Sequence, residues 1–250
     1  MMGTVKRKVR CGGKSMTAIV LAGGRGRRMK ADKAGLSVAG RTLLEHVLGQ
    51  LEPYFDEILV SVSSGQNVER RRRSRPGRPP RIRIVEDESP NQGPLGGILA
   101  GLKAAANAAC AVIACDIPDI DVSLLRSLAR AAGNAEVAVP VGPAGHFEPL
   151  FAVYRKSVVP EIEALLRNGE RSILPLFGRC RTTALRLDDL SWLRNLNTRG
   201  DYESYLRSLA GRPAGKDAQR RLEIPVGGRT TAPRRKKGRP AQRPGRARRP

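Results

Sequence analysis

Hydrophobic residues alternate between two spacings over most of the chain. Continuous apolar runs, typical of buried strands, recur between segments whose apolar residues lie three or four positions apart, as on one face of a helix. This pattern predicts strands at residues 17–22, 57–63, 81–86, 111–115, 136–141 and 150–154. It predicts helices at residues 42–51, 95–107, 123–132 and 160–167. We therefore expect an α/β fold, with a mostly parallel sheet and helices on both of its faces.

The periodic pattern stops before the end of the chain. A length of 250 residues is sufficient for one α/β domain with a closed hydrophobic core and a tail. After the last apolar segment, Pro, Gly and Arg dominate, and such a composition cannot form a packed core. The sequence predicts a folded domain over residues 16–209, a basic N-terminal extension over residues 1–15 and a disordered tail over residues 210–250.

The positive charge is concentrated in three polar segments, one of which interrupts the expected domain between two strands. The formal net charge is +23, yet the chain without residues 1–15, 69–83 and 207–250 has 18 basic and 20 acidic residues. A tail of this charge is typical of an arm that binds nucleic acid or another polyanion weakly. The alternative is a compositional bias toward Arg, since there are 36 Arg and 10 Lys. We favour this alternative because the tail has no aromatic residue to stack on bases.

Cysteine usage and hydropathy favour a reducing compartment. The four cysteines form no C-x-x-C pair, which argues against a disulfide framework or a paired-thiolate zinc site. No apolar run reaches the roughly 18–20 residues of a membrane helix, and the chain starts without a secretory signal pattern. We expect a cytoplasmic protein without a membrane partner.

Two segments at the expected carboxyl ends of strands, where α/β sheets bind ligands, carry candidate chemistry. In the first, Gly23 and Gly24 follow the opening strand and precede Arg28 and Lys33. Consecutive glycines allow backbone N–H groups to approach a phosphate, and the two cations can neutralise its oxygens. The alternative is a Gly-rich turn with solvated arginines. A Rossmann fingerprint is excluded because Met29 occupies the position of its third glycine.

The second segment places Asp116 directly after the apolar run at residues 111–115. A carboxylate at the end of a buried strand is costly unless it is paired or binds a cation. We interpret Asp116 as a ligand of Mg²⁺ that bridges the protein and substrate phosphates. The alternative is a helix cap, but Asp121 or Ser123 is better placed to cap the next helix.

Five segments in order resemble the molybdenum cofactor guanylyltransferases, a family of nucleotidyltransferases. They extend over about residues 16–206 and read Leu21-Ala22-Gly23-Gly24 with Arg28-Met29 and Asp32-Lys33, Gly93-Pro94-Leu95-Gly96-Gly97-Ile98, Ala114-Cys115-Asp116-Ile117-Pro118, Glu148-Pro149-Leu150, and Asn195-Leu196-Asn197-Thr198. The resemblance implies a single Rossmann-like nucleotidyltransferase domain with a last helix at residues 202–209. It further implies that GMP passes from GTP to the phosphate of molybdenum-molybdopterin, with Mg²⁺ and release of pyrophosphate.

The resemblance also implies roles for individual residues. Residues that would contact the nucleotide or its phosphates are Leu21, Ala22, Gly23, Lys33 and Asp87, while Asp116 would bind the magnesium ion and Asn195 and Asn197 would face the pterin. Ser61 lies where some relatives have an asparagine on the guanine side. Transient contact with molybdoenzymes or other cofactor-synthesis proteins is expected as well.

A phosphate monoester is already an anionic nucleophile, so the protein needs mainly to align it and to neutralise charge. We expect Mg²⁺ on Asp116 at the α-phosphate, with Arg28, Lys33 and the Gly23–Gly24 amides holding the leaving pyrophosphate. The alternatives are a cytidylyltransferase acting on the same cofactor, a sugar-phosphate or phospholactate nucleotidyltransferase, and a basic nucleic-acid-binding protein with a degenerate enzyme body.

Overall fold

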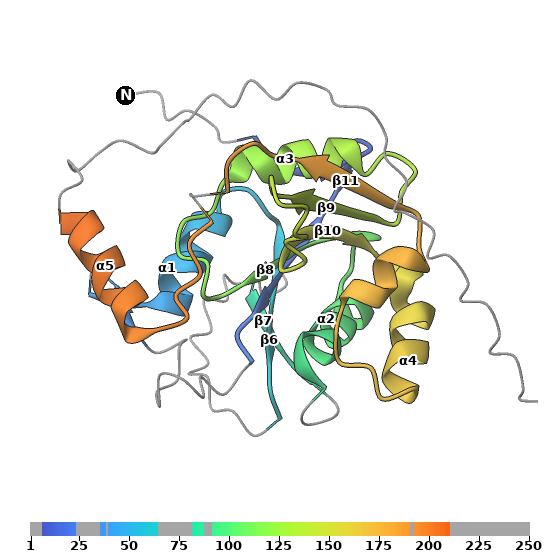
Figure 1. Cartoon of the computed structure of the whole chain (residues 1–250), viewed down its shortest axis with the longest axis horizontal. Helices are drawn as coiled ribbons and strands as arrows, with labels where there is room; N and C mark the ends of the chain where they lie inside the picture. Colours follow the sequence, from blue (N-terminus) through green and yellow to red (C-terminus); the bar gives the residue numbers. More distant parts are fainter. Residues whose placement is uncertain are drawn as a thin grey trace, which may run out of the picture.

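A seven-stranded sheet forms the centre of the molecule (Figure 1). The computed structural model of the chain describes residues 7–23, 36–38, 40–64, 82–87, 92–190 and 193–210. The sheet order is β11-β9-β10-β8-β3-β6-β7. Its strands are β3 (Thr17–Leu21), β6 (Glu57–Val62), β7 (Ile82–Glu86), β8 (Ala109–Ala114), β9 (Val137–Val141), β10 (Phe151–Arg155) and β11 (Thr182–Arg186).

Only β10 runs against the other strands of this described sheet. It pairs antiparallel with both β8 and β9, while all remaining neighbours are parallel. The chain reverses between β9 and β10 through a short connection, where Val141 and Phe147 form an antiparallel bridge. A parallel pairing of consecutive strands would require a longer crossover, usually a helix.

Helices cover both faces of the sheet. One face packs against α1 (Leu43–Leu51) and α3 (Val122–Ala131), and the other packs against α2 (Gly93–Ala104) and α4 (Val159–Arg167). The last helix, α5 (Arg199–Ala210), lies beside α1 at the side of the molecule (Figure 1). None of the helices in the described residues is long and apolar enough to cross a membrane.

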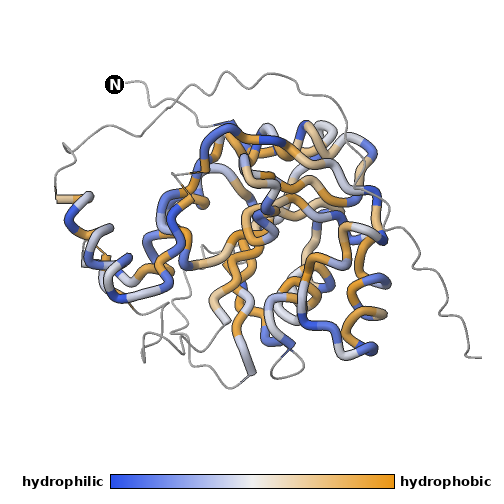
Figure 2. Tube along the Cα trace, in the orientation of Figure 1, coloured by the Kyte–Doolittle hydropathy of each residue, from blue (hydrophilic) through white to orange (hydrophobic). Residues whose placement is uncertain are grey.

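The central strands are buried on both faces, which explains their continuous apolar sequences. Along β3, Ala18 and Val20 belong to the core under α1 and α3, whereas Ile19 and Leu21 belong to the core under α2 and α4. Figure 2 shows hydrophobic residues concentrated along these strands, while hydrophilic residues dominate α5. The expected mostly parallel α/β fold with helices on both faces is therefore confirmed.

Several short elements were not predicted. They are the edge strand β11, the hairpin β1 (Arg10–Cys11) with β2 (Lys14–Ser15), the hairpin β4 (Ser37–Val38) with β5 (Arg41–Thr42), and two 3₁₀ helices, η2 (Lys156–Val158) and η3 (Leu174–Gly178). Val9 and Cys11 are buried in the core under α1 and α3, so part of the expected N-terminal extension packs on the domain. The tail from residue 211 lies outside the described residues.

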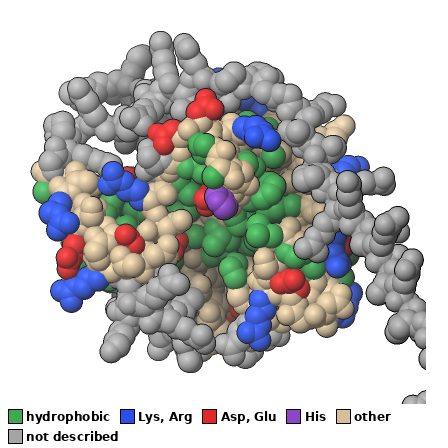
Figure 3. Space-filling model, in the orientation of Figure 1, with side chains coloured by type: hydrophobic (Ala, Val, Ile, Leu, Met, Phe, Trp, Pro, Cys, Tyr) green, Lys and Arg blue, Asp and Glu red, His purple; other side chains and the backbone are tan. Residues whose placement is uncertain are grey.

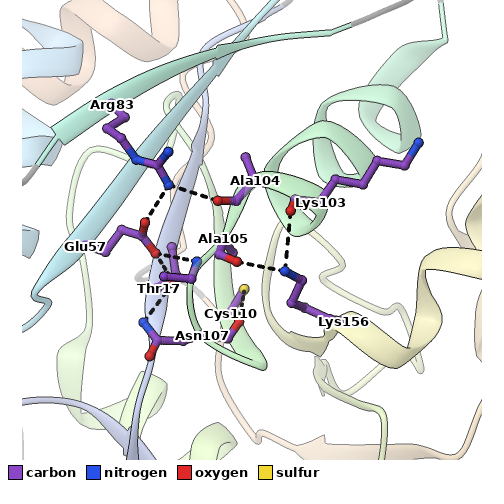
Figure 4. Close-up of polar contacts among 10 residues, drawn as sticks. Thr17, Glu57, Arg83, Lys103, Ala104, Ala105, Asn107, Cys110 and Lys156 are labelled. Atoms are coloured by element: carbon purple, nitrogen blue, oxygen red, sulfur yellow. Dashed lines mark hydrogen bonds and ion pairs between the residues drawn. The ribbon is translucent and has the colours of Figure 1, made fainter.

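A polar network at the amino edge of the sheet surrounds Glu57, the first residue of β6 (Figure 4). Its carboxylate accepts hydrogen bonds from the Thr17 hydroxyl at 2.6 Å, the Arg83 guanidinium at 2.6 Å and the Ala106 backbone N–H at 2.9 Å. Burial by itself raises the pKa of Glu57, but these hydrogen bonds and the charge of Arg83 outweigh it and hold the pKa below its ordinary value. The network favours the ionised form.

The same network holds the C-terminal end of α2. Arg83 donates to the Ala104 carbonyl at 2.9 Å, and the Lys156 ammonium donates to the Ala105 carbonyl at 2.8 Å (Figure 4). The last carbonyls of a helix have no partner within it and carry a partial negative charge, so two cations stabilise this end. These contacts fix the C-terminal end of α2 at the amino edge of the sheet, while its N-terminal end lies at the opposite edge.

Candidate active site

Backbone hydrogen bonds join the described candidate residues into one line across the carboxyl edge of the sheet. The N–H groups of Ala22 and Gly23 donate to the Ser61 carbonyl at 2.8 and 3.1 Å. On the other side of β3, the Cys115 N–H donates to the Leu21 carbonyl at 3.0 Å. Since β3, β6, β7 and β8 are parallel, their carboxyl ends meet here, as the sequence predicted.

Asp87 lies at one end of this line, after β7. Its N–H donates to the Val62 carbonyl at 2.9 Å, and its carboxylate lies against the first turn of α2. A Cβ atom at Gly96 would be only 2.3 Å from one Asp87 carboxylate oxygen, so the contact requires glycine. The N-terminal end of a helix favours a negative charge, and this position therefore suits Asp87.

Glycines also allow α2 and the end of β3 to approach β6 closely. A Cβ atom at Gly97 would be 2.9 Å from the Ser61 hydroxyl oxygen and 3.3 Å from Leu21 Cδ2. A Cβ atom at Gly23 would be 2.9 Å from the backbone nitrogen of Ser63. The floor of the site is therefore made of backbone and small side chains, which lets a ligand approach the strand ends.

Asp116 lies on the other side of β3, directly after the fully buried strand β8. It is half-buried, and the helix that follows is capped by Asp121, whose carboxylate accepts from the Leu124 N–H at 2.9 Å. Asp116 is therefore not the cap of α3, which removes the alternative interpretation of this residue.

The donor set suits a metal ion that is shared with a substrate. The described residues contain no group of three or more His, Cys, Asp or Glu side chains that could hold a metal by itself. Mg²⁺ is commonly bound by one or two carboxylates together with substrate phosphates and water. Asp116 follows β8 and Asp87 follows β7, and these strands are three spacings, about 14 Å, apart in the sheet.

Asn195 and Asn197 are brought to the same edge. Leu196 between them donates its N–H to the Asp116 carbonyl at 2.9 Å, while both asparagine side chains are exposed. The Asp201 carboxylate accepts from the N–H of Asn197 at 3.1 Å and that of Thr198 at 2.8 Å. These contacts fix the turn that precedes α5 next to Asp116.

Gly24, Arg28 and Lys33 lie outside the described residues. The segment that contains them begins after Gly23 and ends before Leu36, whose carbonyl accepts from the Leu43 N–H at the start of α1. The expected contacts of these three residues with phosphates stay predictions.

Sequence reasoning gave no role to Glu148, which precedes β10 at the same edge. Burial raises the pKa of its carboxyl above the ordinary value, and nearby His146 partly offsets this effect. The centroid of the adjacent Phe147 ring lies 5.0 Å from the centroid of the Phe177 ring. Figure 3 shows hydrophobic side chains gathered at the centre of this face of the molecule. Only the motif Glu148-Pro149-Leu150 pointed to this position, without a chemical reason.

Comparison with known proteins agrees with this geometry. Residues 18–183 match the family model described as a MobA-like NTP transferase domain. A protein from Pelotomaculum thermopropionicum named probable molybdenum cofactor guanylyltransferase is 34% identical over 180 residues, which cover 72% of this chain and 83% of the relative.

Solved structures show the same fold. A molybdopterin-guanine dinucleotide biosynthesis protein A from Archaeoglobus fulgidus superposes with a TM-score of 0.66 at 24% identity, covering 79% of this chain and all of the other. A Mycobacterium tuberculosis protein crystallised in complex with manganese superposes with a TM-score of 0.54 at 19% identity and covers 78% of this chain and 100% of that chain.

Proposed function

Because this chain belongs to the family of MobA-like NTP transferase domains, we propose that it transfers GMP from GTP to the phosphate of molybdenum-molybdopterin. An oxygen of the acceptor phosphate attacks the α-phosphorus of GTP, and the bond from that phosphorus to the bridging oxygen breaks. The products are the guanine dinucleotide of the cofactor and pyrophosphate, so atoms and charge balance without a redox step.

One observation carries the proposal. The line of hydrogen bonds from Asp87 through Ser61 and Leu21 to Cys115, and from Asp116 to Leu196, supports it, because the segments that we assign to the nucleotide and to the acceptor lie at one edge. Transfer between two bound anions depends chiefly on alignment and on charge neutralisation, and a shared rigid edge supplies the alignment.

Within this proposal, residues 21–23 and Asp87 bind the nucleotide, and the Asn195–Asn197 segment binds the acceptor on the other side of Asp116. Arg28, Lys33 and the Gly23–Gly24 amides hold the leaving pyrophosphate. Asp116 would hold a divalent ion, Mg²⁺ in our proposal, because a single carboxylate beside substrate phosphates suits this cation. When bound, the ion would withdraw charge from the phosphate oxygens. The cytoplasmic location and transient contacts with molybdoenzymes or other cofactor-synthesis proteins are also proposals.

The base preference is testable with the purified full chain. The protein is incubated with Mg²⁺, the molybdenum-loaded pterin and each of the four nucleoside triphosphates, and pyrophosphate is measured. We expect release with GTP and little with the other three. Release with CTP alone would identify the cytidylyltransferase alternative, and release with none would contradict the proposed function.

Asp116→Ala tests the site itself. We expect pyrophosphate release to fall by about 10²–10³-fold or more, because stabilisation of developing charge is lost. The matched control is Asp188→Ala, which removes an exposed carboxylate after the edge strand β11 and should leave the rate unchanged. Circular dichroism checks that both variants fold. Full activity of Asp116→Ala would remove this residue from the site.

A further inference from the structure

The last helix, α5, packs on a small hydrophobic core of its own. This core contains Val38, Leu43, Leu196 and Tyr205, and it is separate from the two cores that flank the sheet. It joins the β4–β5 hairpin, the start of α1, the turn before α5 and α5 itself. The helix is therefore attached beside the candidate site and does not cover the main sheet (Figure 1).

The loop that carries Asp116 is held by hydrogen bonds from three directions. From α1, the Gln50 amide donates to the Pro118 carbonyl at 2.7 Å and accepts from the Ile120 N–H at 3.0 Å. From the turn before α5, the Leu196 N–H donates to the Asp116 carbonyl at 2.9 Å. From α5, the Tyr205 hydroxyl donates to Asp119 at 2.9 Å. Tyr205 is thus the link from the body of α5 to the loop.

The Tyr205 hydroxyl is the centre of a short chain of hydrogen bonds. The residue is only 1% exposed, and its oxygen lies 3.3 Å from His46 Nε2 on α1. A hydroxyl has one proton, which Tyr205 gives to Asp119, so His46 is the donor in the other bond. Hydrogen bonds of this kind are stronger in a buried environment than in water.

We propose that Tyr205 is a positioning residue for the transfer reaction. Through Asp119 it fixes the Asp116 loop, and through α5 it holds the Asn195–Asn197 turn against that loop. The inference rests on the proposed function, in which Asp116 lies at the reacting phosphate and the turn binds the acceptor. This role explains why α5, which lies outside the main sheet, has a buried tyrosine whose hydroxyl is hydrogen-bonded to both His46 and Asp119.

The physical reason lies in the demands of in-line displacement. The attacking oxygen and the α-phosphorus must be held at close range, and a misplacement of about 1 Å can reduce the rate by about 10²-fold. Asp116 and the acceptor-binding turn come from segments about 80 residues apart, and the backbone hydrogen bond from Leu196 to Asp116 joins them. A second link through Tyr205 and Asp119 restricts their relative movement.

The test is Tyr205→Phe in the full chain, which keeps the ring in the core and removes only the hydroxyl. We expect a higher KM for the molybdenum-loaded pterin and a kcat lower by about 10–100-fold. The affinity for GTP, measured by calorimetry without the acceptor and without Mg²⁺, should stay within about twofold, because Asp87 and Ser61 lie on the other side of β3 from the Asp116 loop.

Two variants separate positioning from simple attachment of the helix. Tyr202→Phe removes a hydroxyl on the same helix that donates to the Ser37 carbonyl, away from the Asp116 loop, and should leave the acceptor KM unchanged. Asp119→Asn keeps the acceptor oxygen for Tyr205 and should retain most activity, whereas Asp119→Ala should resemble Tyr205→Phe. The double variant Tyr205→Phe with Asp119→Ala should lose no more activity than the single variant Asp119→Ala, because both changes remove the same hydrogen bond.

Hydrogen exchange gives a readout that is independent of turnover. Tyr205→Phe should accelerate exchange of the Leu196 and Ile120 amides, and Tyr202→Phe should not. Unchanged exchange, or an equal loss of activity in both variants, would overturn the inference. A wild-type chain that releases no pyrophosphate would instead overturn the proposed function, while faster exchange in Tyr205→Phe alone would still support the link.

Discussion

The carboxylate of Asp87 illustrates how single residues shape the site. It occupies the space in which any side chain at position 96 would begin, and it does so at the N-terminal turn of α2. The glycine is therefore required by contact with a neighbour, since its own backbone has no positive φ angle. A function of Asp87 in binding the nucleotide would depend on the absence of a side chain at position 96.

Gly96→Ala should weaken nucleotide binding. The new Cβ atom would lie 2.3 Å from an Asp87 oxygen, so the carboxylate must move away from its place at the sheet edge. We expect the Kd for GTP with Mg²⁺ to rise by about tenfold or more, which corresponds to about 1.4 kcal/mol. Titration calorimetry measures this change.

The matched control is Gly49→Ala in α1, where the nearest atom to the new Cβ would be 3.9 Å away. This variant should bind GTP normally and unfold at a higher temperature, because alanine favours the helix by about 1 kcal/mol. Equal GTP binding by both variants would show that Asp87 does not depend on Gly96.

Sequence reasoning could locate some residues of the site but not others. Asp116 could be placed at the sheet edge because it directly follows a predicted strand, and parallel strands end together, whereas Asp87 was singled out by the family resemblance. Gln50, Asp119 and Tyr205 gave no such signal, because their contacts join α1, a loop and α5 only in the folded chain. The expected roles of Arg28 and Lys33 stay predictions.

At the scale of elements, α2 connects the two edges of the sheet. Its N-terminal turn faces Asp87 and its C-terminal carbonyls accept hydrogen bonds from Arg83 and Lys156. Opposite charges thus lie at the two ends of the helix dipole, as the dipole favours. Gly97 and Gly101 let the helix lie directly on β6 and β3 between these ends.

Glu57→Gln tests the amino-edge network through its pH dependence. The folded pKa of Glu57 is lowered, so its contribution to stability is complete above the unfolded value of about 4.3 and is lost as the pH falls through the folded value. At pH 7 the variant should be less stable by about 1–3 kcal/mol, because Arg83 loses its charged partner. Urea unfolding at pH 7 and at lower pH should show that the difference in free energy of unfolding between the wild type and Glu57→Gln shrinks on acidification.

Glu163→Gln serves as the control, since it removes a carboxylate that is also ion-paired but more exposed, bound to Lys103 of α2 at 2.9 Å. Exposed ion pairs contribute little, so its unfolding midpoint at pH 7 should stay close to that of the wild type. If the difference in free energy of unfolding between Glu57→Gln and the wild type grew on acidification, this would contradict a lowered pKa of Glu57 in the folded protein.

The predicted elements are those with strong periodic patterns. The buried strands and the amphipathic helices α1, α3 and α4 were expected because apolar residues specify them locally. The edge strand β11 was missed because its residues are only half-buried and its sequence lacks an apolar run. The two hairpins have strands of two residues, too short for any period to be detected.

At the scale of the whole molecule, most of the excess positive charge lies outside the main sheet and its helices. The formal net charge of +23 comes mainly from segments outside the sheet and its helices, whereas the rest of the chain is close to neutral. The edge of the candidate site carries Asp87 and Asp116, and the cations predicted to hold the phosphates, Arg28 and Lys33, belong to the segment that follows Gly23.

Deletion of residues 211–250 should leave GMP transfer intact. The candidate site is defined by described residues and by motifs that end before residue 211, so we expect kcat and KM to stay within about twofold. Binding of the full chain to duplex DNA, measured by fluorescence anisotropy at two salt concentrations, should be weak and strongly salt-dependent, and the deletion should abolish most of it. Loss of transfer activity on deletion would show that the tail takes part in the reaction.

The antiparallel strand β10 has a consequence for how this protein could evolve or be redesigned. Because it reverses the chain, its beginning, next to Glu148, lies among the carboxyl ends of its neighbours, so the connection from β9 to β10 opens at the edge that carries the candidate site. In the proposed reaction, insertions there would extend over the acceptor without shifting any parallel strand. New acceptor chemistry could therefore be acquired at this turn while the nucleotide half is inherited unchanged.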